Sequence, residues 1–276
     1  MKTGRKVRDL GVLPGPVLLF GGPCSNLEAT RALRAWARAR GIDAAHTICT
    51  GDVVAYCASP RETVAEIRDW GVRVVAGNCE QRLAAQAPGC GCGFAPGSTC
   101  DRLSAGWYAH AGAELGGDER GWMADLPEIA TFTHAGRRHA VIHGGATEIS
   151  RFLWPSSREV EFAEEVAAIT ALAGPVETVV AGHCGLAFRR RVAGVEWINA
   201  GAVGMPPNDG APETRFALLE EGRASIHRLA YDHRAACAAM VAAGLTQGYE
   251  RALVSGYWPS EDVLPPDLRR AARASG

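Results

Sequence analysis

The first third of the chain alternates short apolar runs with stretches that have a helical period. Residues 17–20 (Val-Leu-Leu-Phe) form an uninterrupted apolar run, which predicts a buried strand. Ser25 and Glu28 have the spacing of a capping box, and Leu33 and Trp36 lie on one face of the helix that would follow. The pattern therefore predicts a strand that leads into an amphipathic helix.

The same alternation occurs once more. Residues 46–50 predict a second short strand. Pro60 suits the first turn of a helix that Gly71 closes, and residues 72–76 return as a strand. Strands connected in this way pair in parallel, and α/β sheets bind ligands beyond the carboxyl ends of their strands. We therefore expect functional side chains directly after the second and third strands.

Residues 81–126 lack strand patterns and begin with a segment rich in cysteine and glycine. We expect a loop followed by short helices around Trp107, Tyr108 and Trp122. This segment is a candidate cap insertion over the binding pocket, in which the aromatic side chains would contact substrate. Packing in the core is the alternative use of these side chains.

The second half of the chain returns to strand patterns and ends in helical ones. Residues 129–134 and 138–142 predict a hairpin that turns at residues 135–136. Later strands are predicted at residues 178–181, 195–198, 215–219 and 224–229. These strands predict a second sheet. We expect a single domain over residues 1–276, with residues 232–276 as a C-terminal helical extension.

The composition is that of a globular protein with balanced charge. The chain has 276 residues, of which 47% are hydrophobic and 21% are charged, and its formal net charge is −1. Such a chain can bury one large core. This charge balance argues against nucleic acid or a membrane surface as the main partner. We interpret the basic residues 189–191 as the solvent-exposed edge of a hairpin. Without an apolar run long enough for a membrane span or signal peptide, we expect a cytoplasmic protein.

Cysteine is unusually concentrated in one part of the chain. Of nine cysteines, four lie close together in sequence: Cys79, Cys90, Cys92 and Cys100. In the cytoplasm we expect thiols or metal ligands, since cytosolic redox buffers keep most thiols reduced. The glycines of residues 89–93 (Gly-Cys-Gly-Cys-Gly) would let the backbone wrap closely around a bound group. A zinc or iron–sulfur centre is one interpretation, and a glycine-rich loop with reduced cysteines is the other.

Four short polar motifs stand where strands are expected to end. They are Gly51-Asp52, Gly77-Asn78-Cys79-Glu80, His143-Gly144-Gly145 and Gly182-His183. One carboxylate, one amide oxygen and two imidazoles form a mixed oxygen and nitrogen set that suits zinc, manganese or iron. Asp52, Asn78, His143 and His183 are therefore candidate ligands of one divalent metal ion. Turn roles for the Asp and Asn, and packed positions for the histidines, are the alternatives.

Taken in order, these motifs resemble those of the calcineurin-like metallophosphoesterases, particularly the small bacterial phosphodiesterases. The family motifs are Asp-x-His, Gly-Asp, Gly-Asn-His-Asp/Glu, a single His and Gly-His-x-His, and together they bind two metal ions. The resemblance covers roughly residues 15–230 and includes residues 198–206, which look like the family's closing Asn-Pro-Gly-Ser-Val-Gly segment. It implies an α/β (α+β) fold, a two-sheet β-sandwich flanked by helices, here with a Cys/Gly-rich helical cap insertion.

The chain departs from the family motifs at the ligands of one metal. Gly22 and Cys24 stand where the family has the Asp and His of its first motif, and Gly185 replaces the last His. The resemblance assigns the other metal to residues that this chain retains: Asp52, Asn78, His143 and His183. It therefore implies a mononuclear site. We expect a weaker or altered reaction, because the clamp formed by two metal ions would be missing.

Three cysteines lie in or beside these motifs. Cys79 stands where the family has its catalytic His, so it is a candidate proton donor or an additional metal ligand. Cys24 and Cys184 belong to motifs that would approach the same pocket, and they are candidate thiolate ligands. The alternative for each is the usual role of a free cysteine, a small buried apolar side chain.

The leading hypothesis is a metal-dependent phosphoesterase that hydrolyses a phosphodiester or phosphomonoester of a small phosphorylated molecule. Its cofactor would be one divalent ion of manganese, zinc or iron. The second hypothesis is a degenerate relative that binds a nucleotide or phosphorylated ligand without hydrolysis. The third is a sensor with a cysteine-ligated metal or an iron–sulfur cluster. A homo-oligomer is compatible with each, and residues 257–259 (Tyr-Trp-Pro) are expected to hold the tail against the body or a second subunit.

Overall fold

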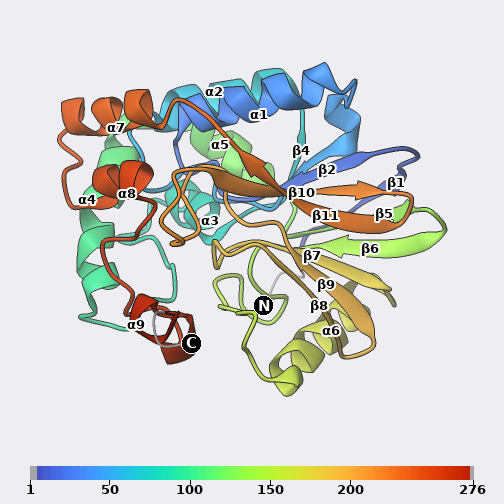
Figure 1. Ribbon diagram of the computed structural model, residues 1–276. Helices are drawn as coiled ribbons and strands as arrows, with labels where there is room; N and C mark the ends of the chain where they lie inside the picture. The colour runs from blue at the N-terminus through green and yellow to red at the C-terminus, as the bar shows by residue number, and fades with distance from the viewer. Residues whose placement is uncertain (1–4, 274–276) are drawn as a thin grey trace.

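In the computed structural model, which describes residues 5–273, two β-sheets pack face to face between outer helices (Figure 1). The five-stranded sheet contains, in spatial order, β11 (Arg223–Leu229), β10 (Thr214–Glu220), β2 (Val17–Phe20), β3 (Thr47–Cys49) and β4 (Arg73–Val74). The six-stranded sheet contains β1 (Val7–Val12), β5 (Ile129–His134), β6 (Arg137–Val141), β7 (Thr178–Ala181), β9 (Val195–Asn199) and β8 (Phe188–Val192). The expected two-sheet α/β architecture is confirmed.

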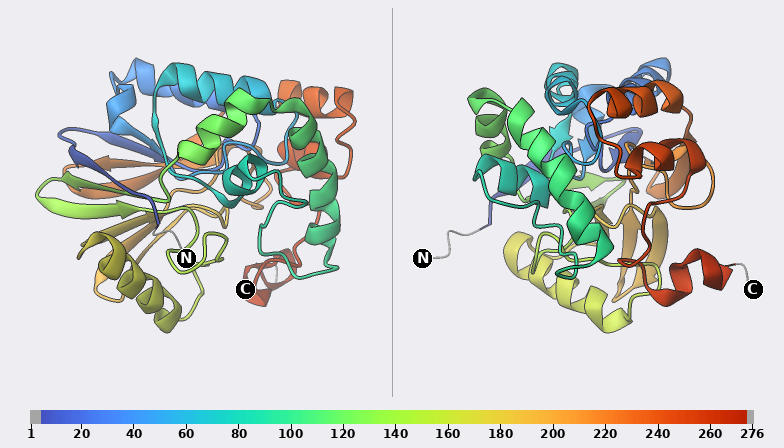
Figure 2. Two further views of the ribbon diagram at one scale, coloured as in Figure 1. Left: turned by 180° about the vertical axis from the view of Figure 1, so that it is seen from behind. Right: turned by 90° about the vertical axis from the view of Figure 1, so that its left-hand side faces the viewer.

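Helices cover the outer faces of both sheets and extend past one end of them (Figures 1 and 2). They are α1 (Leu27–Ala39), α2 (Pro60–Trp70), α3 (Asn78–Ala84), α4 (Thr99–Glu114), α5 (Gly117–Asp125), α6 (Glu159–Ala173), α7 (His233–Ala242), α8 (Tyr249–Ser255) and α9 (Arg270–Arg273), with short 3₁₀ turns η1 (Ala44–His46) and η2 (Pro266–Leu268). Helices α1 and α2 lie along the five-stranded sheet, and α6 lies against the opposite sheet (Figures 1 and 2). Both faces of each sheet are thereby covered over much of their length.

The apolar run of β2 follows from this layering. Successive side chains of a strand point to opposite faces. Leu18 and Phe20 join the core under the helices, where the Phe20 ring stacks on Trp70 with 5.8 Å between centroids. Val17 and Leu19 join the core between the two sheets. Because both faces are buried, every position of β2 is apolar.

The predicted start of the first helix is wrong by one residue. Asn26 is the N-cap of α1, and its side chain accepts a hydrogen bond of 3.0 Å from the Ala29 backbone N–H. Ser25 has a φ of 57°, which differs from the extended backbone of most N-cap residues. The Ser25 to Glu28 spacing therefore does not act as a capping box.

Several elements were not predicted, among them β1, α3 and α6, and of these β1 and α6 lack a clear pattern. Strand β1 pairs in parallel with β5, but most of its residues are exposed. Helix α6 has apolar residues on both its buried and its open side, since Phe162 is fully buried and Val160 is 52% exposed. The predicted hairpin of β5 and β6 is confirmed, with a turn at Ala135 and Gly136, which both have positive φ.

The segment expected to form a cap contains the predicted loop and helices. Trp107 is fully buried in the core and packs against Tyr56, with 4.9 Å between ring centroids. The loop before α4 contributes Cys92 and Phe94 to the wall of a cavity. Core packing therefore accounts for Trp107, while the treatment of residues 81–126 as a separate insertion stays a prediction.

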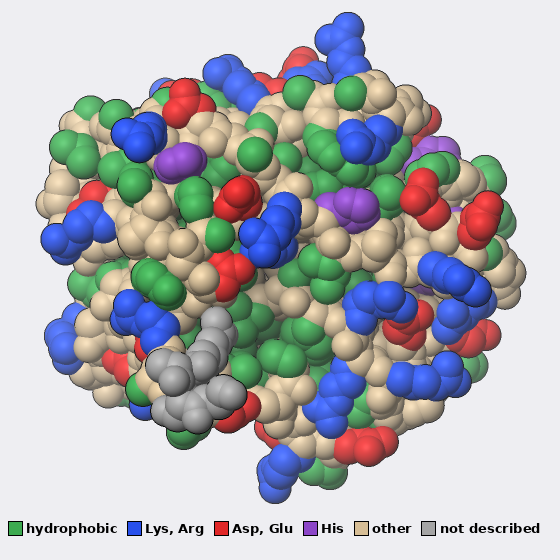
Figure 3. Space-filling model, viewed as in Figure 1, with side chains coloured by type: hydrophobic (Ala, Val, Ile, Leu, Met, Phe, Trp, Pro, Cys, Tyr) green, Lys and Arg blue, Asp and Glu red, His purple; other side chains and the backbone are tan. Residues whose placement is uncertain are grey.

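The tail after β11 contains α7, α8, η2 and α9, joined by loops, and it is bound to the body of the protein. The Trp258 indole N–H donates to the Pro206 carbonyl at 2.7 Å, and the Trp258 backbone N–H donates to Asn208 Oδ1 at 2.8 Å. Basic and acidic side chains are interspersed on the face shown in Figure 3. Within residues 5–273, no helix has the length and apolar character needed to cross a membrane.

Candidate metal centre

Each sheet supplies two of the predicted ligands, all from positions that follow the end of a strand. Asp52 follows β3, and Asn78 follows β4 as the first residue of α3. These two strands run in parallel in the five-stranded sheet. His143 and His183 follow β6 and β7, which are parallel neighbours in the other sheet. The two sheets therefore present their carboxyl ends to one common place.

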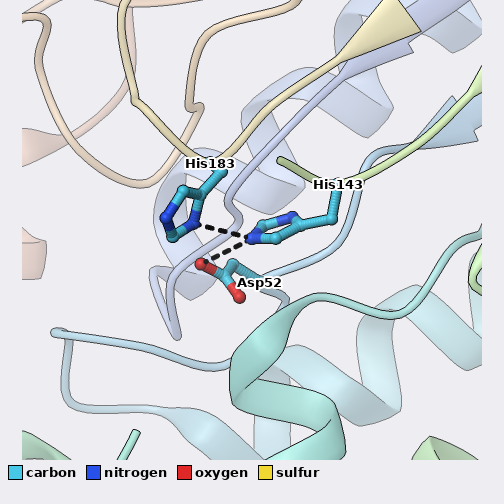
Figure 4. A group of neighbouring side chains, drawn as sticks. All are labelled: Asp52, His143 and His183. Carbon is cyan, nitrogen blue, oxygen red and sulfur yellow. Dashed lines mark hydrogen bonds and ion pairs between the residues drawn. The ribbon is translucent and has the colours of Figure 1, made fainter. Parts of the chain in front are cut away.

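The four side chains meet at the Nε2 atom of His143. This atom is 3.0 Å from Nδ1 of His183, 3.0 Å from Oδ1 of Asn78 and 3.4 Å from Oδ2 of Asp52. Figure 4 shows the carboxylate and the two imidazoles directed at one another. Among residues 5–273 this is the one group of three His, Cys, Asp or Glu residues whose ligand atoms all lie within 4.8 Å. The structure thus brings together all four predicted ligands.

Hydrogen bonds behind the ligands fix which atoms face the centre. Nδ1 of His143 donates to the Thr50 carbonyl at 2.7 Å, because a carbonyl can only accept. In the neutral imidazole this leaves the lone pair of Nε2 directed at the other ligands. The Asn78 amide nitrogen donates to the Cys90 carbonyl at 3.0 Å, so its oxygen faces His143. Both orientations suit metal binding.

Two of the candidate ligands have an uncommon backbone conformation. Asp52 has a φ of 53° and His183 a φ of 62°. Residues with a side chain enter this left-handed region rarely, and such positions are frequent at functional sites. The surrounding hydrogen bonds must therefore hold these residues in place.

Glu80 holds the Asp52 loop, and the sequence interpretation gave it no role. Its carboxylate accepts hydrogen bonds from the backbone N–H groups of Gly77 at 2.8 Å, Asp52 at 2.9 Å and Val54 at 3.2 Å. The Glu80 side chain is fully buried, and burial together with the charge of Asp52 raises its pKa to about 7. Its place at the acidic position that ends the Gly77-Asn78-Cys79-Glu80 motif was the signal in the sequence.

The electrostatics keep two ligands in the forms that bind metals. Burial alone would raise the pKa of Asp52, but the neighbouring His143 and His183 lower it below its usual value. Burial lowers the pKa of His183 to about 3, and His143 adds to this effect. Burial acts against a charge on His143 as well, but Asp52 raises the pKa of that imidazole. At neutral pH an ionised Asp52 carboxylate therefore lies beside a neutral His183 imidazole.

This set of atoms fits a divalent cation. The Asp52 carboxylate and the Asn78 oxygen can only accept, the neutral His183 offers a lone pair on Nδ1, and His143 offers one on Nε2 in its neutral form. Two oxygens and two imidazole nitrogens match the preference of zinc, manganese or iron. The geometry thus supports the metal site predicted from the four motifs.

The positions that lack the family's other ligands line a cavity beside this group. Gly22, Cys24 and Gly185 all contribute to its wall, together with Asp52, His143 and His183. The cavity volume is about 70 Å³. A side chain on Gly185 would meet Trp258, since a Cβ atom built there lies 3.4 Å from the indole ring. An apolar side chain of the tail thus lies beside Gly185.

The candidate cysteines Cys24, Cys79 and Cys184 differ in their surroundings. No cysteine sulfur within residues 5–273 belongs to the group of close ligand atoms. Cys24 and Cys184 line the cavity, but the Cys184 thiol donates to the Leu186 carbonyl at 3.6 Å. Cys79 is fully buried outside the set of cavity-lining residues, and its sulfur lies 3.5 Å from the Asn78 amide nitrogen.

Aromatic side chains form part of the rest of the cavity wall. The Phe152 ring lies 4.3 Å from the His183 ring and stacks on Trp154 with 5.1 Å between centroids. Among the described residues that line the cavity, none is lysine or arginine, and Asp52 is the one carboxylate. A bound metal ion would therefore be the main positive charge in this cavity. Sequence patterns gave no sign that Phe152 lies against a ligand.

The comparisons with known proteins agree with this geometry. The family model of the calcineurin-like phosphoesterase superfamily domain matches residues 25–223. A hypothetical protein from Pyrococcus horikoshii OT3 has a similar structure, with a TM-score of 0.72 and 15% identity over 90% of this chain and 99% of that one. A metallophosphoesterase from Sphaerobacter thermophilus has a TM-score of 0.66 and 21% identity over 88% of this chain and 100% of that one. A search of curated proteins gave no match.

Proposed function

The chain belongs to the calcineurin-like phosphoesterase superfamily, and from this premise we propose that it hydrolyses phosphoesters with a single divalent metal ion. The observation that supports this proposal is the convergence of Asp52, Asn78, His143 and His183 on one point. Beside them, Gly22 and Gly185 offer no side-chain ligand. These positions support a site for one ion.

Each residue of the site has a defined part in this proposal. Asp52, Asn78, His143 and His183 would hold the ion, with Thr50 and Glu80 fixing the orientation of two of them. A bound divalent ion polarises a phosphoryl oxygen and lowers the pKa of a bound water. The aromatic side chains Phe152, Trp154 and Trp258 line the cavity beside these residues, where they would limit the access of bulk water to the ion. In such surroundings electrostatic interactions are stronger than in water.

The charge balance favours a phosphodiester over a phosphomonoester. Asp52 offsets one of the two positive charges of a divalent ion, and no other charged side chain of the described residues lines the cavity. One positive charge matches the single negative charge of a phosphodiester. A dianionic monoester would leave an uncompensated charge in a buried, largely apolar site, which is unfavourable.

We therefore expect a higher kcat/KM for bis(4-nitrophenyl) phosphate than for 4-nitrophenyl phosphate, by about tenfold or more, which corresponds to ~1.4 kcal/mol of transition-state stabilisation. Release of 4-nitrophenol at neutral pH with added Mn²⁺ or Zn²⁺ measures both reactions. Equal or faster turnover of the monoester would contradict the charge argument and leave the hydrolase proposal intact.

A nucleotide-binding protein without hydrolysis has less support. The cavity of about 70 Å³ is small beside the ~300–1,000 Å³ typical of small-molecule sites. A nucleotide would need the aromatic wall to open. Elemental analysis of the purified protein, combined with both assays, separates the two functions. Absence of metal after incubation with Mn²⁺, Zn²⁺ or Fe²⁺ would refute the hydrolase proposal, and bound metal without any turnover would favour the binding protein.

A further inference from the structure

A groove lies between the edges of the two sheets, separate from the candidate metal centre. Strand β4 is an edge strand of the five-stranded sheet and has only two residues, and β1 is an edge strand of the six-stranded sheet. Both strands line this groove, whose volume is about 260 Å³. Among the described residues, none lines both this groove and the cavity beside Asp52. The groove is therefore a second opening with its own set of side chains.

The floor of this groove is apolar and continuous with the core of the protein. Leu10 of β1, Ile48 of β3 and Val75 after β4 belong to the core between the sheets. The core under the helices contributes Ile67, Val72, Val74 and Leu126. Trp122 of α5 is half-buried and adds an aromatic ring to the wall. An apolar molecule that displaced water from this floor would gain binding free energy.

Three exposed arginines line the same groove. They are Arg8 of β1, Arg68 of α2 and Arg73 of β4. Arg68 is paired with Asp118 at 2.5 Å, but the side chains of Arg8 and Arg73 have no hydrogen bond or ion pair within residues 5–273. None of the described residues that line the groove is aspartate or glutamate. Two positive charges without a counter-charge therefore stand beside an apolar floor.

From this arrangement we propose that the groove binds a small aromatic anion, with its ring on the apolar floor and its charged group at Arg8 and Arg73. The guanidinium group presents a planar set of N–H donors that matches a carboxylate or phosphate group. The volume of about 260 Å³ lies just below the ~300–1,000 Å³ typical of small-molecule sites, which suits a compact ligand of one or two rings.

Protection of the sheet edges is the other use of these arginines. Charged side chains on edge strands prevent pairing with a second chain. That role depends on charge alone and would be served equally well if side chains filled the space between β1 and β4. The open apolar groove beside Arg8 and Arg73 is what favours a bound ligand.

Calorimetric titration of the full-length protein with 2-naphthoate and its neutral analogue 2-naphthamide tests the proposal. We expect 2-naphthoate to bind about tenfold more tightly, since only the carboxylate forms charge-assisted hydrogen bonds with arginine. Arg8→Gln and Arg73→Gln are each expected to weaken 2-naphthoate binding about two- to fivefold, the range of an exposed ion pair. Both variants should leave 2-naphthamide binding unchanged. Because both positions are exposed, the fold should be retained.

A matched control is Arg38→Gln, because Arg38 is exposed on α1 and does not line the groove. This variant and Asp52→Asn should bind 2-naphthoate with wild-type affinity, so the groove is measured independently of the proposed hydrolytic site. Loss of binding in Asp52→Asn would place the anion at the metal centre and overturn the proposal. Equal affinity for the anion and the amide, or wild-type affinity in both Arg8→Gln and Arg73→Gln, would also overturn it. So would dimer formation that excludes 2-naphthoate, which would assign the groove to a second copy of the chain.

Discussion

The Asp52→Asn variant is expected to lose tight metal binding and about 10³-fold or more in phosphodiesterase kcat/KM. Asparagine has nearly the same size and tolerates the left-handed backbone that Asp52 adopts, so the fold should be retained. The change removes the one carboxylate of the site and leaves two imidazoles and two amides. Loss of a single electrostatic group in an active site commonly costs about 10²–10³-fold, and here the bound ion would be weakened as well.

Calorimetry with Mn²⁺ or Zn²⁺ measures the loss of metal binding in Asp52→Asn. Hydrolysis of bis(4-nitrophenyl) phosphate measures the loss of kcat/KM. Asp69→Asn is the matched control, because this exposed carboxylate on α2 is paired with Arg34 far from the site. It should leave both quantities within about twofold of wild type. Wild-type activity in Asp52→Asn would contradict the assignment of this residue as a metal ligand.

The Glu80→Ala variant is expected to have the largest effect on stability. The substitution leaves the buried N–H groups of Gly77, Asp52 and Val54 without their acceptor. Each unsatisfied buried group costs about 1–3 kcal/mol, so we expect a loss of about 3–5 kcal/mol in the free energy of unfolding. Since the strained Asp52 backbone is then less well held, metal affinity is expected to fall about 10–100-fold. Urea denaturation and metal titration measure these changes.

The Glu80→Gln variant serves as the control for charge. The Oε2 atom of Glu80 accepts from Gly77 and Asp52, and an amide oxygen at the same place can keep both bonds. With a pKa of about 7, Glu80 is partly protonated near neutrality, so a neutral side chain is a close substitute. We expect less than half of the destabilisation seen in Glu80→Ala. Equal stability of Glu80→Ala and wild type would show that solvent or other groups accept the hydrogen bonds of these backbone N–H groups.

The elements predicted with the best accuracy are those whose residues carry a local signal. Strand β7 has the predicted bounds, and the hairpin at Ala135 and Gly136 follows from its turn residues. Strand β1 carries no such signal, because it is an exposed strand that forms only by pairing with β5. The start of α1 was misplaced because Ser25 and Asn26 are both common caps, and only the fold shows that Ser25 has a positive φ.

The sequence by itself determined the types of candidate ligand and their places after strands. Asp52, Asn78, His143 and His183 could be proposed because carboxylate, amide and imidazole groups have fixed preferences for metals. Only the tertiary structure decided which cysteines gather around Asn78 and that Glu80 holds the Asp52 loop. Those contacts join residues of separate segments. Their distances depend on how two sheets and a loop pack, which no local pattern encodes.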